Sequence, residues 1–292
     1  MARTSTVKKP SKGEVISFDM DIDAVRRRES EVARESDEQI IERLGERFAI
    51  LTEMTKAVKQ GDITAMIVSG PPGVGKSYGV EAVLERDDLF NKLAERKPKF
   101  EVVKGAMSAI GLYSKLYEFS DRGNVIVFDD CDSVLLDEVS LNILKGALDS
   151  SARRFISWNT DSRLLRSEGV PNRFEFKGSA IFITNIKFEH VRSKKLRDHL
   201  NALESRCHYI DLQMDTTREK ILRIRQVVKD NEMLAPYDFE PCVQDELVEF
   251  VETNKDQLRE LSLRMVLKLA GLRKSFPTTW QMMARTTCMK RA

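Results

Sequence analysis

The chain lacks most of the features that mark secreted, zinc-binding or membrane proteins. Its 292 residues include only four cysteines and three histidines, spaced too far apart to form a ligand set. This argues against a disulfide framework and against a zinc site. No apolar run in the sequence approaches the roughly 18 residues of a membrane-spanning helix. We therefore expect a protein of a reduced intracellular compartment, the cytoplasm, with no membrane partner.

A strong charge of one sign is also missing. The net charge is +2, which gives no electrostatic argument for or against a nucleic-acid partner. Hydrophobic residues make up 41% of the chain and charged residues 32%, which is typical of a globular protein slightly rich in charge. The length is enough for about two domains.

The periodicity of apolar residues divides the chain into three parts. Residues 1–36 are polar and charged, and we expect a flexible tail or a docking arm. From Asp37 a helical pattern begins, and after Gly61 strand-like and helical segments alternate. The expected strands are 63–69, 100–104, 124–128 and 180–184, and the expected helices are 77–95, 107–119 and 138–149. This alternation predicts an α/β domain over residues 37–214, with a parallel sheet between helices.

Two further segments interrupt or follow this pattern. Short strand-like pieces near 153–158 and 173–177 predict a β-hairpin inserted before the strand at 180–184. After Asp215 the spacing is helical throughout, in segments near 216–232, 242–253, 258–274 and 277–290. We expect residues 215–292 to form a small helical domain.

The most specific motif lies between the first expected strand and its helix. It fits the phosphate-binding pattern G-x-x-x-x-G-K-[ST] and consists of Gly70, Pro71, Pro72, Gly73, Val74, Gly75, Lys76 and Ser77. The glycines allow main-chain amides to turn inward around phosphate oxygens, and the helix adds its positive end. Lys76 is expected to reach the outer phosphates of ATP, and Ser77 to complete a Mg²⁺ shell.

Polar residues follow two other expected strands. Asp129 and Asp130 end one of them, at the edge of the sheet where ligands bind in open α/β folds. Asp129 is placed to hold Mg²⁺, and Asp130 to orient or polarise the attacking water. Asn185 ends the strand at 180–184 and either hydrogen-bonds the γ-phosphate or the water, or simply forms the turn.

Together these motifs resemble the AAA+ ATPase family over about residues 37–275, and small phage-encoded members in particular. The resemblance implies that residues 70–77 are Walker A, that Asp129 and Asp130 end Walker B, and that Asn185 is sensor 1. It also implies a P-loop NTPase sandwich with a helical lid, a ring-shaped or spiral homo-oligomer, and host cytoplasm if the protein is phage-encoded.

The resemblance also assigns two arginines. Ser205, Arg206 and Cys207 are similar to a segment of clamp-loader subunits in which the arginine reaches the nucleotide of a neighbouring subunit. Arg206 is therefore the candidate arginine finger, with Arg173, Arg192 and Arg197 as rivals. Arg264 lies in a segment that looks like sensor 2 of the lid and would contact the γ-phosphate. The hairpin resembles the pre-sensor-1 insertion of some AAA+ clades.

One departure from the family concerns hydrolysis. The family usually has Asp-Glu at the end of Walker B, whereas this chain has Asp129-Asp130. The shorter side chain of Asp130 sits about one C–C bond further from the water, which would slow hydrolysis or require a small shift.

The substrate is less clear than the nucleotide, and three hypotheses stay open. The first is an ATPase acting on DNA, in replication or loading, with Arg163 and Arg166 of the hairpin and the cluster at 192–197 touching phosphates. The second is a protein remodeller in which the segment 110–113, ending in Tyr113, grips polypeptide. In the alternative reading of that segment, Leu112, Leu116 and Phe119 pack on the sheet. The third is an ATP-binding scaffold or switch with negligible hydrolysis.

Overall fold

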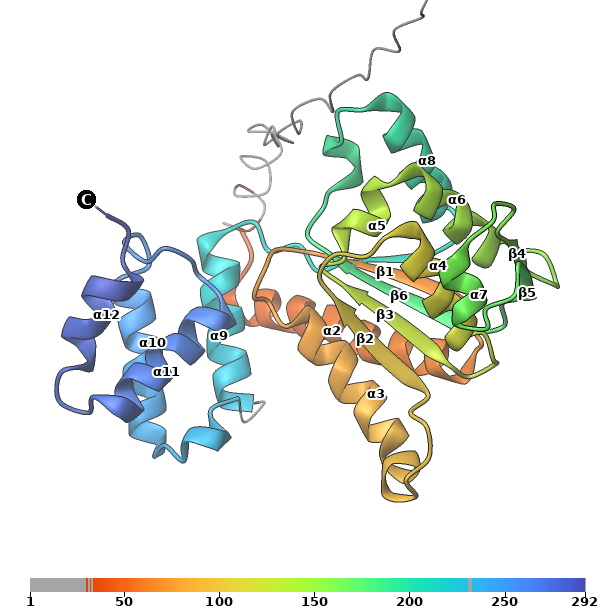
Figure 1. Ribbon diagram of the computed structural model, residues 1–292. Helices are drawn as coiled ribbons and strands as arrows, with labels where there is room; N and C mark the ends of the chain where they lie inside the picture. The colour runs from red at the N-terminus through yellow and green to blue at the C-terminus, as the bar shows by residue number, and fades with distance from the viewer. Residues whose placement is uncertain (1–29, 31, 33, 231–232, 292) are drawn as a thin grey trace, which may run out of the picture.

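A five-stranded parallel sheet forms the centre of the molecule (Figure 1). The computed structural model describes residues 30, 32, 34–230 and 233–291, so most of the expected N-terminal tail lies outside the described residues. In sheet order the strands are β2 (Phe100–Lys104), β3 (Val125–Asp129), β6 (Ser179–Thr184), β1 (Ala65–Ser69) and β7 (His208–Asp211). Four of them match expected strands. The fifth, β7, which follows the others in the chain, was not predicted.

The central strands are buried on both faces. Every residue of β1, β3 and β6 is buried, which is what a parallel sheet covered by helices on both sides requires. Alternate side chains enter two separate apolar clusters. Met66 and Val68 point to one face, while Ile67 points to the other.

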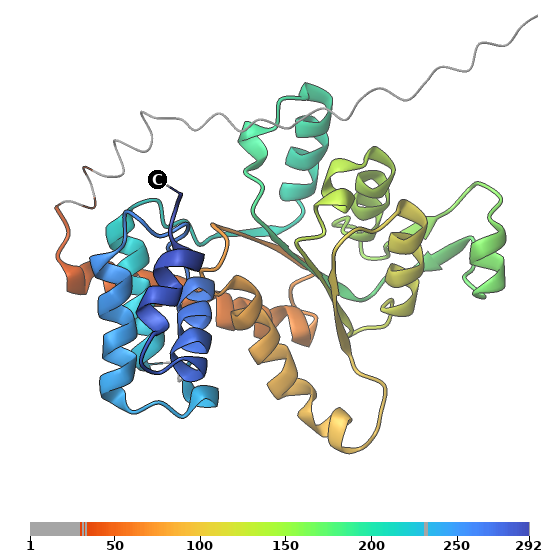
Figure 2. The ribbon, with the colours of Figure 1, turned by 60° about the vertical axis from the view of Figure 1, so that its left-hand side comes forward.

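Helices cover the two faces unequally (Figures 1 and 2). One face carries α2 (Asp37–Gln60) and α3 (Lys76–Leu93). The other carries α4 (Ala109–Glu118), α5 (Asp132–Leu136), α6 (Glu138–Ala147) and α8 (Lys194–Glu204), the last preceded by the 3₁₀ turn η1 (Phe188–His190). Helix α2 begins in a capping box at Ser36 and ends at Gly61, whose left-handed backbone closes the helix.

The inserted segment pairs as a small antiparallel sheet beside α6. Strand β4 (Phe155–Ser157) pairs with β5 (Arg173–Glu175). The connection between them contains the short helix α7 (Arg163–Ser167). Leu165 of α7 is fully buried, which attaches the connection to the main core.

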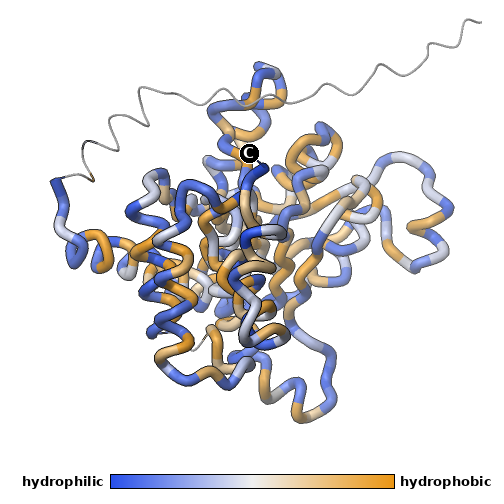
Figure 3. Tube along the Cα trace, turned by 90° about the vertical axis from the view of Figure 1, so that its left-hand side faces the viewer, coloured by the Kyte–Doolittle hydropathy of each residue, from blue (hydrophilic) through white to orange (hydrophobic). Residues whose placement is uncertain are grey.

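The last part of the chain is helical and has its own apolar core. It comprises α9 (Thr217–Asp230), the 3₁₀ turn η2 (Ala235–Tyr237), α10 (Pro241–Thr253), α11 (Leu263–Ser275) and α12 (Trp280–Cys288). We call it the helical lid. Hydrophobic and hydrophilic stretches alternate along its helices in Figure 3, as expected of helices that bury one face. The lid packs beside α2 and the loop between β1 and α3, where Val74, Leu44 and Leu222 share a cluster.

Candidate nucleotide-binding site

The loop between β1 and α3 has the backbone of a phosphate cradle. Gly70, Gly73 and Gly75 have φ values of 153°, 72° and 104°, which side-chain-bearing residues rarely adopt. At Gly70 a Cβ atom would also lie 3.1 Å from the Leu212 carbonyl oxygen. The glycines are therefore required by the path of the main chain, and the loop leads into the amino end of α3, where anions are favoured.

Lys76 is held over this loop. Its ammonium donates to the carbonyl oxygens of Gly70 at 2.6 Å and Pro71 at 2.9 Å, and to Asn185 Oδ1 at 2.7 Å. The side chain is buried, and burial lowers the pKa of the ammonium to about 8 against the opposing effect of Asp130 and Asp129. A negatively charged ligand would stabilise this buried ammonium, because the ligand would replace part of the hydration that the ammonium loses on burial.

Ser77 and Asp129 converge at the first turn of α3. The Ser77 hydroxyl donates to Asp129 Oδ1 at 2.9 Å, joining α3 to the end of β3. Sequence reasoning missed Lys104, which ends β2 opposite Asp129 and lies 3.5 Å from Asp129 Oδ2 and 2.7 Å from Glu81 Oε1. The pairing of β2 with β3 brings these groups together, and a single sequence does not show it. Hard oxygen atoms such as those of Ser77 and Asp129 fit the ligand preference of Mg²⁺.

Asn185 connects Lys76 with the second carboxylate. Its side-chain amide donates to Asp130 Oδ1 at 2.8 Å while its oxygen accepts from Lys76. Asp130 is exposed and has a left-handed backbone, φ 50°, after the buried end of β3. Three of the predicted site residues thus form one chain of hydrogen bonds, Lys76–Asn185–Asp130, across neighbouring strands.

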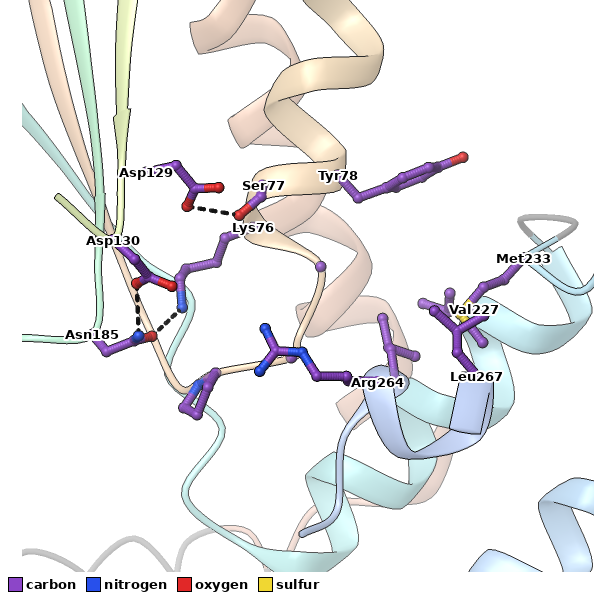
Figure 4. Close-up of a pocket in the computed structure, with 14 residues that line it drawn as sticks. Lys76, Ser77, Tyr78, Asp129, Asp130, Asn185, Val227, Met233, Arg264 and Leu267 are labelled. Atoms are coloured by element: carbon purple, nitrogen blue, oxygen red, sulfur yellow. Dashed lines mark hydrogen bonds between the residues drawn. The ribbon is translucent and has the colours of Figure 1, made fainter. Parts of the chain in front are cut away.

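A pocket extends from these groups toward the lid (Figure 4). Arg264 at the start of α11 points from the lid toward Lys76 and the phosphate loop. The far wall is apolar and was not predicted, because it depends on how the lid docks. It is formed by Val227 of α9, Met233, and Leu263 and Leu267 of α11, with Tyr78 of α3 alongside. The pocket therefore has a charged end and an apolar end, as a nucleotide has.

Arg206 lies near the amino ends of the strands, opposite the ends that carry the phosphate loop. It precedes β7 and lines a separate hollow with Ala65, at the amino end of β1, whereas the phosphate loop follows the carboxyl end of the same strand. Its guanidinium donates to the Ala202 carbonyl oxygen at 2.5 Å and lies 3.9 Å from Asp149. The structure does not bring Arg206 to the phosphate loop of its own chain.

The proposed polypeptide grip at 110–113 is wrong. These residues lie in α4, Leu112 and Tyr113 are fully buried, and the Tyr113 hydroxyl donates to the Pro171 carbonyl oxygen at 2.9 Å. The alternative, that Leu112, Leu116 and Phe119 pack in the core, is confirmed. Arg163 and Arg166 lie on α7, away from the site, and Arg166 pairs with Asp161 at 2.9 Å.

The sheet, the phosphate loop and the helical lid define the class of protein: the fold is a P-loop NTPase α/β sandwich followed by a helical domain. No protein-family model matches the chain. It is 31% identical over 272 residues to an uncharacterized 36.7 kDa protein from the nrdC-mobD intergenic region of Enterobacteria phage T4. The alignment covers 92% of this chain and 81% of the phage protein. The chain belongs to the family of that phage T4 protein.

Two solved structures are more distantly similar. The replication initiator DnaA, bound to AMPPCP and single-stranded DNA, has 12% identity and a TM-score of 0.42 over 81% of this chain and 63% of that chain. NtrX from Brucella abortus, in complex with ATP, has 10% identity and a TM-score of 0.42 over 92% of this chain and 58% of that chain. This chain thus spans less than two thirds of either protein, and likenesses this weak add nothing to the functional argument. The likeness of Ser205, Arg206 and Cys207 to a clamp-loader segment stays a prediction.

Proposed function

We propose that the protein is an ATP hydrolase that binds ATP with Mg²⁺ between its phosphate loop and its lid. The observation that carries the proposal is the hydrogen-bonded chain Lys76–Asn185–Asp130 beside the Ser77–Asp129 pair. It places a cation, an amide, a hydroxyl and two carboxylates at one end of the pocket, which suits phosphoryl transfer to water.

Each group has a role in this proposal. The loop amides and Lys76 bind the phosphates, Ser77 and Asp129 hold the metal, and Arg264 contacts the γ-phosphate from the lid. Asp130 orients and polarises the water that attacks the γ-phosphorus, and Asn185 fixes Asp130 and Lys76 relative to each other. The metal, when bound, neutralises charge on the phosphate oxygens.

A phosphate-release assay together with calorimetry tests this function. We expect Lys76→Ala to abolish both ATP binding and turnover, while Lys92→Ala, on the exposed end of the same helix α3, changes neither. Removing Mg²⁺ with a chelator should also stop turnover. Wild-type levels of binding in the Lys76 variant would refute the site.

We further propose that the active form is a homo-oligomer, a ring or a spiral, in which Arg206 of one copy reaches the nucleotide of the next. Arg206 lies at the amino end of β1, away from the phosphate loop of its own chain, and this position supports the arrangement. A cation there would stabilise charge on the transferred phosphoryl group.

DNA is the substrate class that we favour. Exposed arginines on the β4–β5 insertion, Arg153, Arg163 and Arg173, would contact phosphates without reading sequence. Fluorescence anisotropy with single-stranded and duplex DNA, repeated at rising salt, tests it. An absence of binding to either form at low salt would exclude this substrate. The burial of Tyr113 removes the observation that supported a protein substrate.

A switch that binds ATP and hydrolyses it negligibly is the second candidate. The short side chain of Asp130, engaged by Asn185, favours it. Tight ATP binding with no steady-state release of phosphate, with or without DNA, would establish the switch in place of the hydrolase.

A further inference from the structure

Beside the proposed metal ligands lies a lysine that belongs to none of the sequence motifs. Lys104 ends β2, and its register partner Asp129 ends the neighbouring strand β3. The Lys104 ammonium lies 3.5 Å from Asp129 Oδ2 and 2.7 Å from Glu81 Oε1 of α3. Asp129 Oδ1 accepts the Ser77 hydroxyl at 2.9 Å (Figure 4). Both oxygen atoms of this carboxylate therefore face groups of the protein itself.

The periodicity of three elements brings these four side chains together. The strand residues two positions before Lys104 and Asp129 pack in the apolar cluster on the α3 side of the sheet. Because side chains alternate along a strand, Lys104 and Asp129 point to the same side. Ser77 and Glu81 are four residues apart and share one face of α3. Helix α3 thus supplies a hydroxyl for Asp129 and a carboxylate for Lys104.

Lys104 neutralises a carboxylate that is shielded from water. The side chain of Asp129 is only 7% exposed, whereas that of Lys104 is 58% exposed. A buried carboxylate has lost hydration, so a nearby cation stabilises it. A metal ion held by Asp129 would bring a second positive charge to the same oxygen atoms, and two cations at this distance repel each other. Lys104 and the metal therefore compete for Asp129.

Glu81 offers Lys104 another partner when Asp129 is taken. The hydrogen bond from Lys104 to Glu81 is already formed and is shorter than the contact with Asp129. A lysine ammonium on its flexible four-carbon stem can move between neighbouring carboxylates. Lys104 can thus leave Asp129 and stay paired with Glu81.

The ligands around Asp129 point to a metal that arrives with phosphates. In the part of the chain that the structure describes, no three His, Cys, Asp or Glu side chains are grouped so that they could hold a metal ion. Mg²⁺ in such sites takes one or two protein ligands and completes its shell with substrate phosphates and water. The negative charge of the phosphates would then help the metal to compete with Lys104.

We propose that Lys104 is a positioning residue that neutralises Asp129 until the metal–nucleotide complex binds, and that it then pairs with Glu81 alone. This inference rests on the proposed function and deepens it, because it names the group that sets how strongly Mg²⁺ increases the affinity for the nucleotide. Lys104 weakens the metal at Asp129, and Glu81 limits that effect by drawing the ammonium away.

The coupling between metal and nucleotide tests the proposal. Calorimetry gives the Kd of a non-hydrolysable ATP analogue in EDTA and in excess Mg²⁺, and the first value divided by the second is the coupling ratio. Lys104→Met removes the charge and keeps a long side chain. We expect tighter binding in Mg²⁺, an EDTA value close to that of the parent, and a ratio about 3- to 10-fold higher. A ratio that does not rise, or that rises only because binding in EDTA weakens, overturns the proposal.

Lys115→Met is the matched control. Lys115 also lies between two carboxylates, 2.8 Å from Glu101 and 3.0 Å from Glu118, but it belongs to α4 on the other face of the sheet. This variant should keep the coupling ratio of the parent. A rise as large as that of Lys104→Met would reflect the net charge of the protein and would overturn the role of Lys104.

Glu81→Gln tests the second partner in a double-mutant cycle. With Glu81 neutral, Lys104 is left with Asp129 alone, so the coupling ratio should fall about 3-fold below that of the parent. In the Lys104→Met background the same change should have little effect, because Glu81 acts through Lys104. An equal fall in both backgrounds would show that Glu81 acts on the metal directly, which overturns the exchange of partners.

The parent protein separates this inference from the function on which it rests. If the parent binds the analogue equally in Mg²⁺ and in EDTA, the proposed metal site fails and the inference fails with it. If the parent shows coupling that Asp129→Asn removes and that Lys104→Met leaves unchanged, the metal site stands and only the role of Lys104 is wrong.

Discussion

Asp130 adopts a backbone conformation that explains its own residue type. Its φ of 50° lies in the left-handed region, where Asp and Asn are enriched among residues with side chains. The turn directs its carboxylate to the Asn185 amide and away from the Ser77–Asp129 pair. The two consecutive carboxylates thus have different hydrogen-bond partners, which the sequence alone does not show.

Asp130→Asn should separate binding from turnover. Asn tolerates the same backbone and keeps the size of the side chain, so we expect ATP affinity and thermal stability to stay close to those of the parent. It loses the negative charge that polarises the water, so turnover should fall by about 10²–10⁴-fold. Calorimetry and phosphate release measure the two effects. An Asn variant that hydrolyses ATP at the parental rate would remove Asp130 from the chemistry.

Cys207 gives a pH-dependent prediction beside the candidate finger. Burial raises the pKa of its thiol to about 12. Since the folded state holds this proton more tightly, the contribution of Cys207 to stability is intact below the pKa of an unfolded thiol, about 8.5, and is lost as the pH rises toward 12.

Alkylation measures this protection directly. At pH 8 we expect Cys207 to react at least about 100-fold more slowly than an exposed thiol, because the thiolate is the nucleophile. Cys242, which is exposed, serves as the internal reference in mass spectrometry of the native protein. Equal labelling of both residues in the folded protein would show that the segment before β7 is open.

At the scale of elements, the start of α11 rests directly on the phosphate loop. Leu263 donates its main-chain N–H to the Gly73 carbonyl oxygen at 2.8 Å, and the Ser262 hydroxyl caps the helix by accepting from Met265. A Cβ atom on Gly73 would lie 2.6 Å from Ser262 Cβ. The lid and the loop therefore cannot move independently while this contact lasts.

Gly73→Ala tests that contact, with Gly169→Ala as its control. The two glycines have φ values of 72° and 70°, but Gly169 has nothing within 4 Å of its Cβ position. Both variants should lose about 1–2 kcal/mol of stability from the left-handed backbone. Only Gly73→Ala should lose more than that and weaken ATP binding, as measured by thermal unfolding and calorimetry. If both variants lost the same stability, the lid would move away from the phosphate loop at no cost, and the contact would not hold the two together.

The elements that the sequence predicted are those with a strong local signal. The loop at 70–77 and the strand before Asp129 each have a pattern that is contained within a few consecutive residues. Strand β7 was not predicted because no apolar run marks it. Ile210 is its only buried residue, as is common for an edge strand. The contact of Lys104 with Asp129 and the lid wall at Leu267 arise from packing between distant segments, which one sequence does not encode locally.

At the scale of the whole molecule, the phosphate loop and Arg206, which are both proposed to act in ATP hydrolysis, lie at opposite ends of the strands. The phosphate loop follows the carboxyl end of β1, and Arg206 lines a hollow at its amino end. A rigid sheet separates them, so one copy cannot use both for the same nucleotide. A head-to-tail repeat of copies would join each loop to the next arginine, and it would close into a ring or continue as a spiral.

Mixing two inactive variants tests this arrangement. Lys76→Ala copies would lack a working loop but keep Arg206, and Arg206→Ala copies would have the reverse defect. In a random 1:1 assembly about a quarter of the interfaces join an intact loop to an intact arginine, so about a quarter of the parental turnover should return. Arg197→Ala, on the neighbouring helix α8, should keep its activity without mixing. If the mixture stays as inactive as its parts while both variants still assemble, Arg206 does not act across the interface.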